Sequence, residues 1–202
     1  VIAACNFLRE EYQITKFALY GHSMGAANVF FCLDADQEKK EDSSSQYTIV
    51  AAVADSPFSS LEQEMRDLAG RFSIPGCFTS PAIWYVARRI RNMANFDVYD
   101  VNPVKHAPNC KQPILIIHGK QDDYIKYEHS EILENAYGGP KELIICDGDH
   151  NSCRPMDVQI KLITFLGEQL GVEIKENDIQ NRLFTGQEVF PSCILQEYEP
   201  TS

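Results

Sequence analysis

The sequence predicts an α/β protein with a mostly parallel β-sheet and helices on both faces of the sheet. Two apolar runs, "IVAAVA" at 49–54 and "ILIIH" at 114–118, have the continuous hydrophobicity of strands that are buried on both faces. Helical patterns separate these runs, so strands and helices alternate along the chain. Glycine or proline follows two of the helical patterns directly, at 138–140 and at Gly171, as expected where a helix ends.

The individual elements follow from these patterns in chain order. The sequence predicts helix 1–12, strand 14–20, helix 25–33, strand 49–54, helices 61–72 and 81–96, strand 114–118, helix 130–137, strand 143–146 and helix 158–170. The stretch 34–46, "DADQEKKEDSSSQ", is polar and charged, and we expect it to form a solvated surface loop. The tail, 172–202, has weak periodicity, and no element is predicted there.

The composition limits the classes of function. The chain has 202 residues, of which 44% are hydrophobic, enough for one globular domain with a sizeable core. The formal net charge of −11 repels phosphate, which argues against nucleic acid as a partner. The 7 cysteines and 5 histidines form no cluster with metal-ligand spacing, so no metal or other cofactor is expected. Cysteines that are odd in number and scattered are typical of a reducing compartment, and we expect a cytoplasmic protein.

A glycine-flanked serine follows the first predicted strand. Gly21-His22-Ser23-Met24-Gly25 lies between that strand and a predicted helix. A strand that turns at once into a helix holds its middle residue in a strained conformation, and glycine two positions to either side avoids a clash. Such a turn would raise the Ser23 hydroxyl above the sheet and place the Met24 backbone N–H where an oxyanion could bind. The alternative is a glycine-rich turn with an idle serine.

Two further groups follow the later strands. Asp122 and Asp123 come after strand 114–118, where a carboxylate could orient an imidazole or simply form an acidic turn. His150 comes after strand 143–146, where it could be a general base or a solvated loop residue. In parallel sheets the active site lies beyond the carboxyl ends of the strands. Serine, then aspartate, then histidine, each directly after a strand, is the order of the hydrolase triad.

The chemistry requires all three groups. A serine hydroxyl is a poor nucleophile at neutral pH, so His150 would have to accept the proton of Ser23. A carboxylate would then hold the imidazole in the correct tautomer and stabilise the imidazolium. At this point either Asp122 or Asp123 could supply that carboxylate.

Five segments together resemble a known family. The sequence is similar to α/β-hydrolases of the serine aminopeptidase S33-like and protein-thioesterase-like group, including plant and protist serine hydrolases. The resemblance lies in "GHSMGA" (21–26), "ADSPFSSL" (54–61), "NFDVYDVNPV" (95–104), "HGKQDDYI" (118–125) and "GDHNSCRP" (148–155).

The resemblance implies a role for each group. Ser23 would be the nucleophile, His150 the base and Asp122 the acid, because the family motif places the acid three residues after the glycine. The fold would be the C-terminal part of an α/β-hydrolase fold, with the N-terminal strands absent. Residues 1–171 would then form the C-terminal portion of a single domain, with 57–112 as a possible lid or flanking helices and 172–202 as a tail.

The sequence departs from the family at its N-terminus. Family members have further strands before the strand of the nucleophile and a loop that supplies a second oxyanion donor. About 100 residues would be absent, at ~30 residues per strand–helix unit. The partner implied is this missing N-terminal segment of the same domain. The predicted strand at 17–20 is therefore expected to expose one edge or to pair with polypeptide outside this sequence.

The function implied is that of a serine hydrolase, which cleaves an ester, thioester or amide through an acyl-enzyme on Ser23. The substrate would be a small molecule or an acylated one, and the acyl and leaving groups are not specified by the sequence. The alternative is a non-catalytic hydrolase-fold remnant or an assembly subunit. The presence of all three triad residues argues against a non-catalytic remnant. The absence of the N-terminal segment with the second oxyanion donor argues against activity of this chain by itself.

Other histidines and one helix have simpler interpretations. His22 is expected to be a packing residue, His118 to pack at its strand end, and His106 and His129 to lie at the surface. Helix 81–96 carries Trp84, Tyr85 and the arginines at 88, 89 and 91. We expect a surface helix that buries its aromatic side chains, with a cap that faces substrate or a membrane as the alternative.

Overall fold

The computed structural model describes residues 1–41, 47–71 and 75–174. These residues form a four-stranded sheet in the order β1-β2-β3-β4, and every neighbouring pair of strands is parallel. The strands are β1 (Lys16–His22), β2 (Thr48–Asp55), β3 (Ile114–Gly119) and β4 (Lys141–Cys146). The predicted fold class is confirmed. In this part of the chain β1 is an edge strand that pairs with β2 alone, so its open edge is also confirmed.

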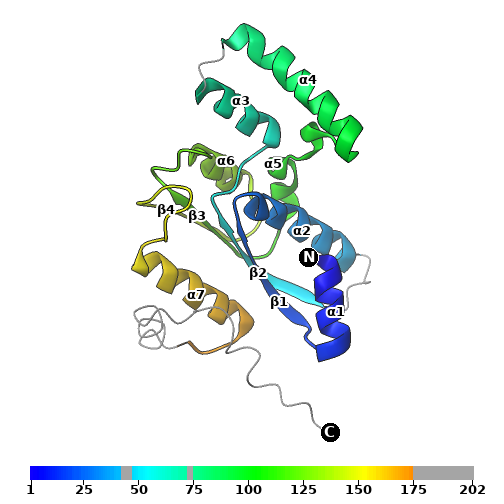
Figure 1. Ribbon diagram of the computed structural model, residues 1–202. Helices are drawn as coiled ribbons and strands as arrows, with labels where there is room; N and C mark the ends of the chain where they lie inside the picture. Colours follow the sequence, from blue (N-terminus) through cyan, green and yellow to red (C-terminus); the bar gives the residue numbers. More distant parts are fainter. Residues whose placement is uncertain (42–46, 72–74, 175–202) are drawn as a thin grey trace.

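Helices cover both faces of the sheet. Helix α7 lies on one face, and α1, α2, α5 and α6 lie on the other, while α3 and α4 stand away from the sheet (Figure 1). The helices are α1 (Ile2–Tyr12), α2 (Met24–Glu41), α3 (Leu61–Arg71), α4 (Gly76–Ala94), α5 (Pro103–His106), α6 (Glu128–Ala136) and α7 (Met156–Leu170), with short 3-10 helices η1 (Val98–Asp100) and η2 (Ala107–Asn109).

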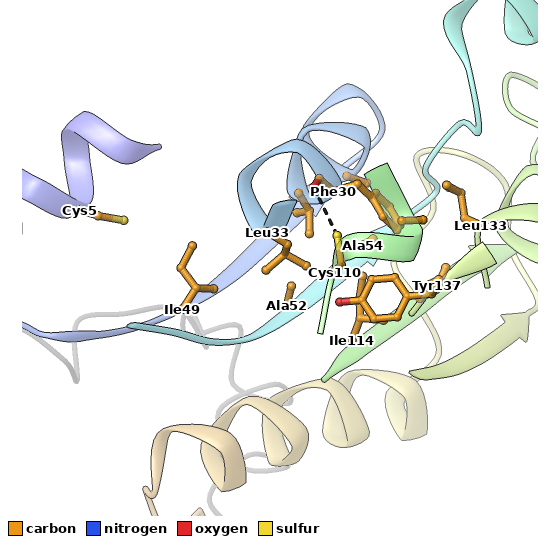
Figure 2. Packing of buried hydrophobic residues seen from close by; sticks show 14 of the residues in the cluster. Cys5, Phe30, Leu33, Ile49, Ala52, Ala54, Cys110, Ile114, Leu133 and Tyr137 are labelled. Atoms are coloured by element: carbon orange, nitrogen blue, oxygen red, sulfur yellow. Dashed lines mark hydrogen bonds between the residues drawn. The ribbon is translucent and has the colours of Figure 1, made fainter. Parts of the chain in front are cut away.

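The central strands are buried on both faces because alternate side chains enter two different clusters. On β2, Ala52 and Ala54 face the cluster that contains Phe30 and Leu33 of α2 (Figure 2). Val53 between them faces the opposite cluster, which α7 completes. This alternation with a period of two explains the continuous apolar runs in the sequence, because neither face of these strands meets water.

The expected loop at 34–46 is wrong over its first part, because α2 continues to Glu41. Two acidic side chains in this part are buried and have partners in the segment before β3. The Asp34 carboxylate lies 2.6 Å from Nδ1 of His106, and the Asp36 carboxylate accepts a hydrogen bond of 3.0 Å from the Gln112 side chain. These tertiary contacts thus stabilise a helix where the polar composition had predicted a loop. Residues 42–46 lie outside the described part of the chain, as does most of the tail, 175–202.

Helix α4 begins at Gly76, several residues before the predicted start at 81. Pro81 lies inside the helix, where it leaves the Cys77 carbonyl without its usual i+4 donor. Packing compensates for that loss, because Thr79, Ile83 and Ala87 form one buried stripe at successive spacings of four residues. None of the helices in the described ranges is both long and apolar enough to cross a membrane.

Candidate active site

The structure brings together the three predicted site residues. The Ser23 hydroxyl lies 3.1 Å from Nε2 of His150, and Nδ1 of His150 lies 2.7 Å from Oδ2 of Asp122. Since a carboxylate can only accept, Nδ1 carries the proton and Nε2 is free to accept the proton of the serine hydroxyl. The three residues follow β1, β3 and β4, so they meet at the carboxyl edge of the sheet. This is the geometry of a Ser–His–Asp triad.

Ser23 lies on a strained turn between β1 and α2. Its φ angle is 56°, in the left-handed region that residues with a side chain seldom adopt. The Ser23 N–H donates a hydrogen bond of 2.8 Å to the Asp55 carbonyl, which ties the turn to the end of β2. A Cβ on Gly21 would lie 2.3 Å from the Gly25 carbonyl oxygen, so glycine is required at Gly21. A Cβ on Gly25 would meet nothing within 4 Å in the described residues, and the expected crowding there is wrong.

Met24 is the first residue of α2. Its backbone N–H therefore belongs to the first turn, whose donors have no acceptor within the helix, and it lies at the positive end of the helix dipole. The Met24 side chain is 68% exposed. This N–H follows Ser23 directly in the chain, and its role as an oxyanion donor stays a prediction.

The carboxyl group of Asp122 is fully buried and receives several hydrogen bonds. Its Oδ1 accepts from the N–H groups of Tyr124 at 2.9 Å and Ile125 at 2.8 Å, while Oδ2 faces His150. Burial acts to raise the pKa of this carboxyl, but the hydrogen bonds from His118, His150 and Ile125 outweigh it and hold the pKa well below its ordinary value. Asp122 is therefore an anion at neutral pH.

The neighbouring carboxyl group, on Asp123, points elsewhere. Its side chain is 64% exposed and pairs with Arg71 at 3.3 Å. Of the two aspartates in the acid turn, the structure therefore places Asp122 against His150, which agrees with the preference from the family motif.

His118 supports Asp122 from within the protein, a contact that sequence reasoning missed. The expected packing at the strand end is confirmed, because the imidazole is fully buried. Its Nε2 lies 2.9 Å from the Ile125 carbonyl, so Nε2 carries the proton, and Nδ1 accepts from the Ser130 hydroxyl at 2.6 Å. The same Nε2–H lies 3.3 Å from Oδ2 of Asp122. The sequence feature that could have indicated this contact is the histidine at the start of the "HGKQDD" segment.

Arg154 fastens the loop of His150 to the end of β2. Its guanidinium is buried and donates to the Asp55 carboxylate, with Nη2 at 2.6 Å and Nε at 3.0 Å from Oδ1. Nη1 donates to the Asp149 carbonyl, one residue before His150, at 2.9 Å. A Cβ on Gly119 would lie 2.4 Å from the Gly148 carbonyl oxygen and 2.7 Å from Nη1 of Arg154. Glycine at Gly119 thus lets the acid turn and the histidine loop touch.

Two aromatic rings flank the His150 imidazole. The His22 ring lies 4.9 Å from it, centroid to centroid, and its Nε2 is 2.9 Å from the His150 carbonyl. The Tyr124 ring lies 5.4 Å from the imidazole. These contacts restrict rotation of His150 and confirm His22 as a packing residue.

Relatives of this chain are known from sequence and from structure. A comparison with models of protein families gives no match. The chain is similar to the uncharacterized proteins YfhR of Escherichia coli (strain K12), with 27% identity over 151 residues, and YqkD of Bacillus subtilis (strain 168), with 26% over 134 residues. These matches cover 73% and 65% of this chain but 43% and 40% of the relatives, so the chain spans less than half their length.

Solved structures show which fold this is. The Pyrococcus furiosus esterase Pf2001 superposes with a TM-score of 0.54 and 20% identity, covering 84% of this chain and 59% of that one. Est1E from Butyrivibrio proteoclasticus gives 0.58 and 17%, covering 84% and 68%. The acylaminoacyl peptidase of Pyrococcus horikoshii gives 0.57 and 18%, covering 87% and 28%. The chain has part of an α/β-hydrolase fold. Ser23, Asp122 and His150 occupy the edge of this fold where active sites lie.

A second polar cluster joins α3 to the α/β-hydrolase core near Asp122. His129 is buried, which corrects its expected surface position. Its Nδ1 accepts from the Ser59 N–H at 3.1 Å, so Nε2 carries the proton and donates to the Asp67 carboxylate at 3.1 Å. Glu64 lies 3.4 Å from the same Nε2. Within the described ranges, no three or more His, Cys, Asp or Glu side chains are arranged to hold a metal ion.

Glu64 is expected to make stability depend on pH. Burial, with the charges of Asp67 and Asp122, raises the pKa of Glu64 from 4.5 to about 7. Between these two values the folded protein keeps a proton that the unfolded chain releases. The free energy of unfolding should therefore fall as pH rises through this interval, by up to about 3 kcal/mol.

The measurement is urea unfolding of the parent and of Glu64→Gln at pH 5 and pH 8. The variant is expected to be more stable than the parent at pH 8 and similar to it at pH 5. Glu131→Gln, at an exposed position on α6, is the control. An equal change at both pH values would contradict the assignment to Glu64.

Proposed function

We propose that this chain carries the catalytic centre of a serine hydrolase that cleaves an ester, thioester or amide. The observation that supports this proposal is the continuous array from Ser23 through His150 to Asp122, with contacts of 3.1 and 2.7 Å. Such an array activates a hydroxyl that is otherwise unreactive at neutral pH. The similarity to an esterase and an acylaminoacyl peptidase agrees with acyl transfer as the class of reaction.

The proposed reaction has two halves. In the first, Oγ of Ser23 attacks the carbonyl carbon while its proton passes to Nε2 of His150, and Asp122 stabilises the imidazolium. The Met24 N–H stabilises the oxyanion, and His150 then gives the proton to the leaving group as its bond to carbon breaks. In the second half, water loses a proton to His150 and attacks the acyl-enzyme, which releases the acid and restores the Ser23 hydroxyl.

Labelling of the full-length protein with a fluorophosphonate probe tests this proposal. Oγ of Ser23 should form a bond to phosphorus as fluoride leaves, giving one adduct per chain on the peptide that contains Ser23. Ser23→Ala is expected to lose the adduct, whereas Ser80→Ala, at an exposed serine on α4, is expected to keep it. A folded protein that carries no adduct, or carries it on another serine, would contradict the proposal and favour a non-catalytic hydrolase fold.

A further inference from the structure

The outward surface of α4 carries a mixed apolar and basic patch. Helix α4 packs against α3 and η1 and forms the outermost layer of the protein (Figure 1). Thr79, Ile83 and Ala87 occupy its inner stripe. We define the α4 surface by the exposed side chains on the rest of the helix: Phe78, Trp84, Tyr85, Val86, Met93, Arg88, Arg89 and Arg91.

The aromatic side chains of this surface are not buried, which corrects the sequence-based expectation. Phe78 is 63% exposed, Trp84 58% and Tyr85 59%. The buried stripe repeats every four residues and therefore takes up only one side of the helix. The aromatic side chains lie on the other sides, where the described part of the chain offers no element to pack against. Exposed apolar side chains gathered in one place typically mark an interaction site.

The charge of α4 is opposite to that of the chain as a whole. The helix has three arginines and no aspartate or glutamate, whereas the formal net charge of the chain is −11. Asp97 pairs with Arg91 and neutralises it. The guanidinium of Arg88 lies over the Trp84 ring, 5.8 Å from its centroid, and Arg89 is exposed one position further along. Two basic groups therefore remain among the aromatic side chains to meet an anionic partner.

We propose that the α4 surface binds an anionic lipid bilayer, with the helix axis parallel to the membrane plane. Aromatic rings are favoured at the boundary between headgroups and acyl chains, and arginines extend from there to lipid phosphates. A bilayer accepts a convex surface in which apolar and basic groups alternate. A protein partner would instead need a groove shaped for it, which makes the bilayer the better match for these side chains.

The α4 surface is connected to the candidate active site through α3. Helix α3, on which α4 packs, is fastened to the acid turn by the contact of Arg71 with Asp123 and by the Arg71 guanidinium over the Tyr124 ring. Lys126 adds a second tie to Asp67 of α3, at 3.1 Å. Binding through α4 would thus set the distance and orientation of the triad relative to the bilayer. The binding does not depend on catalysis, so Ser23→Ala is expected to bind equally well.

The chain contains its own reporter for the test, because Trp84 is its single tryptophan. On titration with phosphatidylcholine vesicles that contain phosphatidylserine, the Trp84 emission is expected to shift to shorter wavelength and to be quenched by brominated acyl chains. Vesicles of phosphatidylcholine alone are expected to leave the emission unchanged, and high salt is expected to reverse the shift.

Charge-reversal variants distinguish binding through the α4 surface from non-specific adsorption of the protein to vesicles. The double variant Arg88→Glu, Arg89→Glu is expected to weaken binding in vesicle sedimentation by about tenfold or more. The control, Lys16→Glu with Lys105→Glu, reverses two exposed charges elsewhere and is expected to bind like the parent. An unchanged emission, equal binding to neutral vesicles, or equal loss in the control would overturn the proposal. Shielding of Trp84 by an acidic protein, with no response to vesicles, would instead indicate a protein interface.

Discussion

Asp122→Asn is expected to lower kcat by about a thousandfold or more, whereas Asp123→Asn should change it by less than about twofold. The reason lies in the two backbone donors. The N–H groups of Tyr124 and Ile125 both point at Oδ1, so the amide oxygen of the asparagine would take that position. Its NH₂ group would then face Nδ1 of His150 and donate to it. The imidazole would carry its proton on Nε2, where it can no longer accept the proton of Ser23.

The two variants form a matched pair at adjacent positions with the same change of charge. Steady-state hydrolysis of an acyl ester measures kcat, and circular dichroism checks that both variants are folded. A large loss in Asp123→Asn together with a small loss in Asp122→Asn would show that the acid has been assigned to the wrong residue.

Arg154→Met is expected to lower the free energy of unfolding by about 3–5 kcal/mol, because it leaves the buried Asp55 carboxylate without its cation. Only 4% of the Asp55 side chain and 6% of the Arg154 side chain are exposed, so water cannot replace the lost partner. The partly exposed pair of Arg66 with Glu62, one helical turn apart on α3, supplies the control. Arg66→Met is expected to cost less than about 1 kcal/mol.

A double-mutant cycle separates the interaction of Arg154 with Asp55 from the contribution of each residue alone to the free energy of unfolding. Asp55→Asn combined with Arg154→Met removes both charges and should recover part of the loss in urea unfolding. Because Arg154 also holds the Asp149 carbonyl, hydrolysis by the double variant is expected to stay slow even where stability recovers. Full recovery of kcat along with stability would show that Arg154 does not position the loop of His150.

The sequence predicted the sheet and the site residues because their signals are local. The runs that became β2 and β3 are continuously apolar, and Ser23, Asp122 and His150 each come shortly after the end of a strand. These signals can be read without knowledge of tertiary contacts. Because every neighbouring pair of strands is parallel, the carboxyl ends of β1, β3 and β4 all lie at the same end of the sheet.

The features that the sequence did not reveal depend on contacts between distant segments. Helix α2 continues through a polar stretch because Asp34 meets His106, a residue 72 positions away. Arg154 and Asp55 are 99 positions apart, and neither residue type by itself predicts a buried ion pair. The exposure of Trp84 reflects the absence of a neighbouring element on that side within the described ranges, which no local pattern encodes.

The positions of the three site residues along the chain have a consequence for the order of folding. Asp122 and His150 are 28 residues apart, whereas Ser23 and His150 are 127 apart. Closing the shorter loop costs less chain entropy, so the pair of Asp122 and His150 can form within the β3–α6–β4 segment before β3 docks on β2. During synthesis from the N-terminus, the serine leaves the ribosome first and the histidine last. The contact between Ser23 and His150 would therefore be among the last formed, and its presence reports that the whole sheet is assembled.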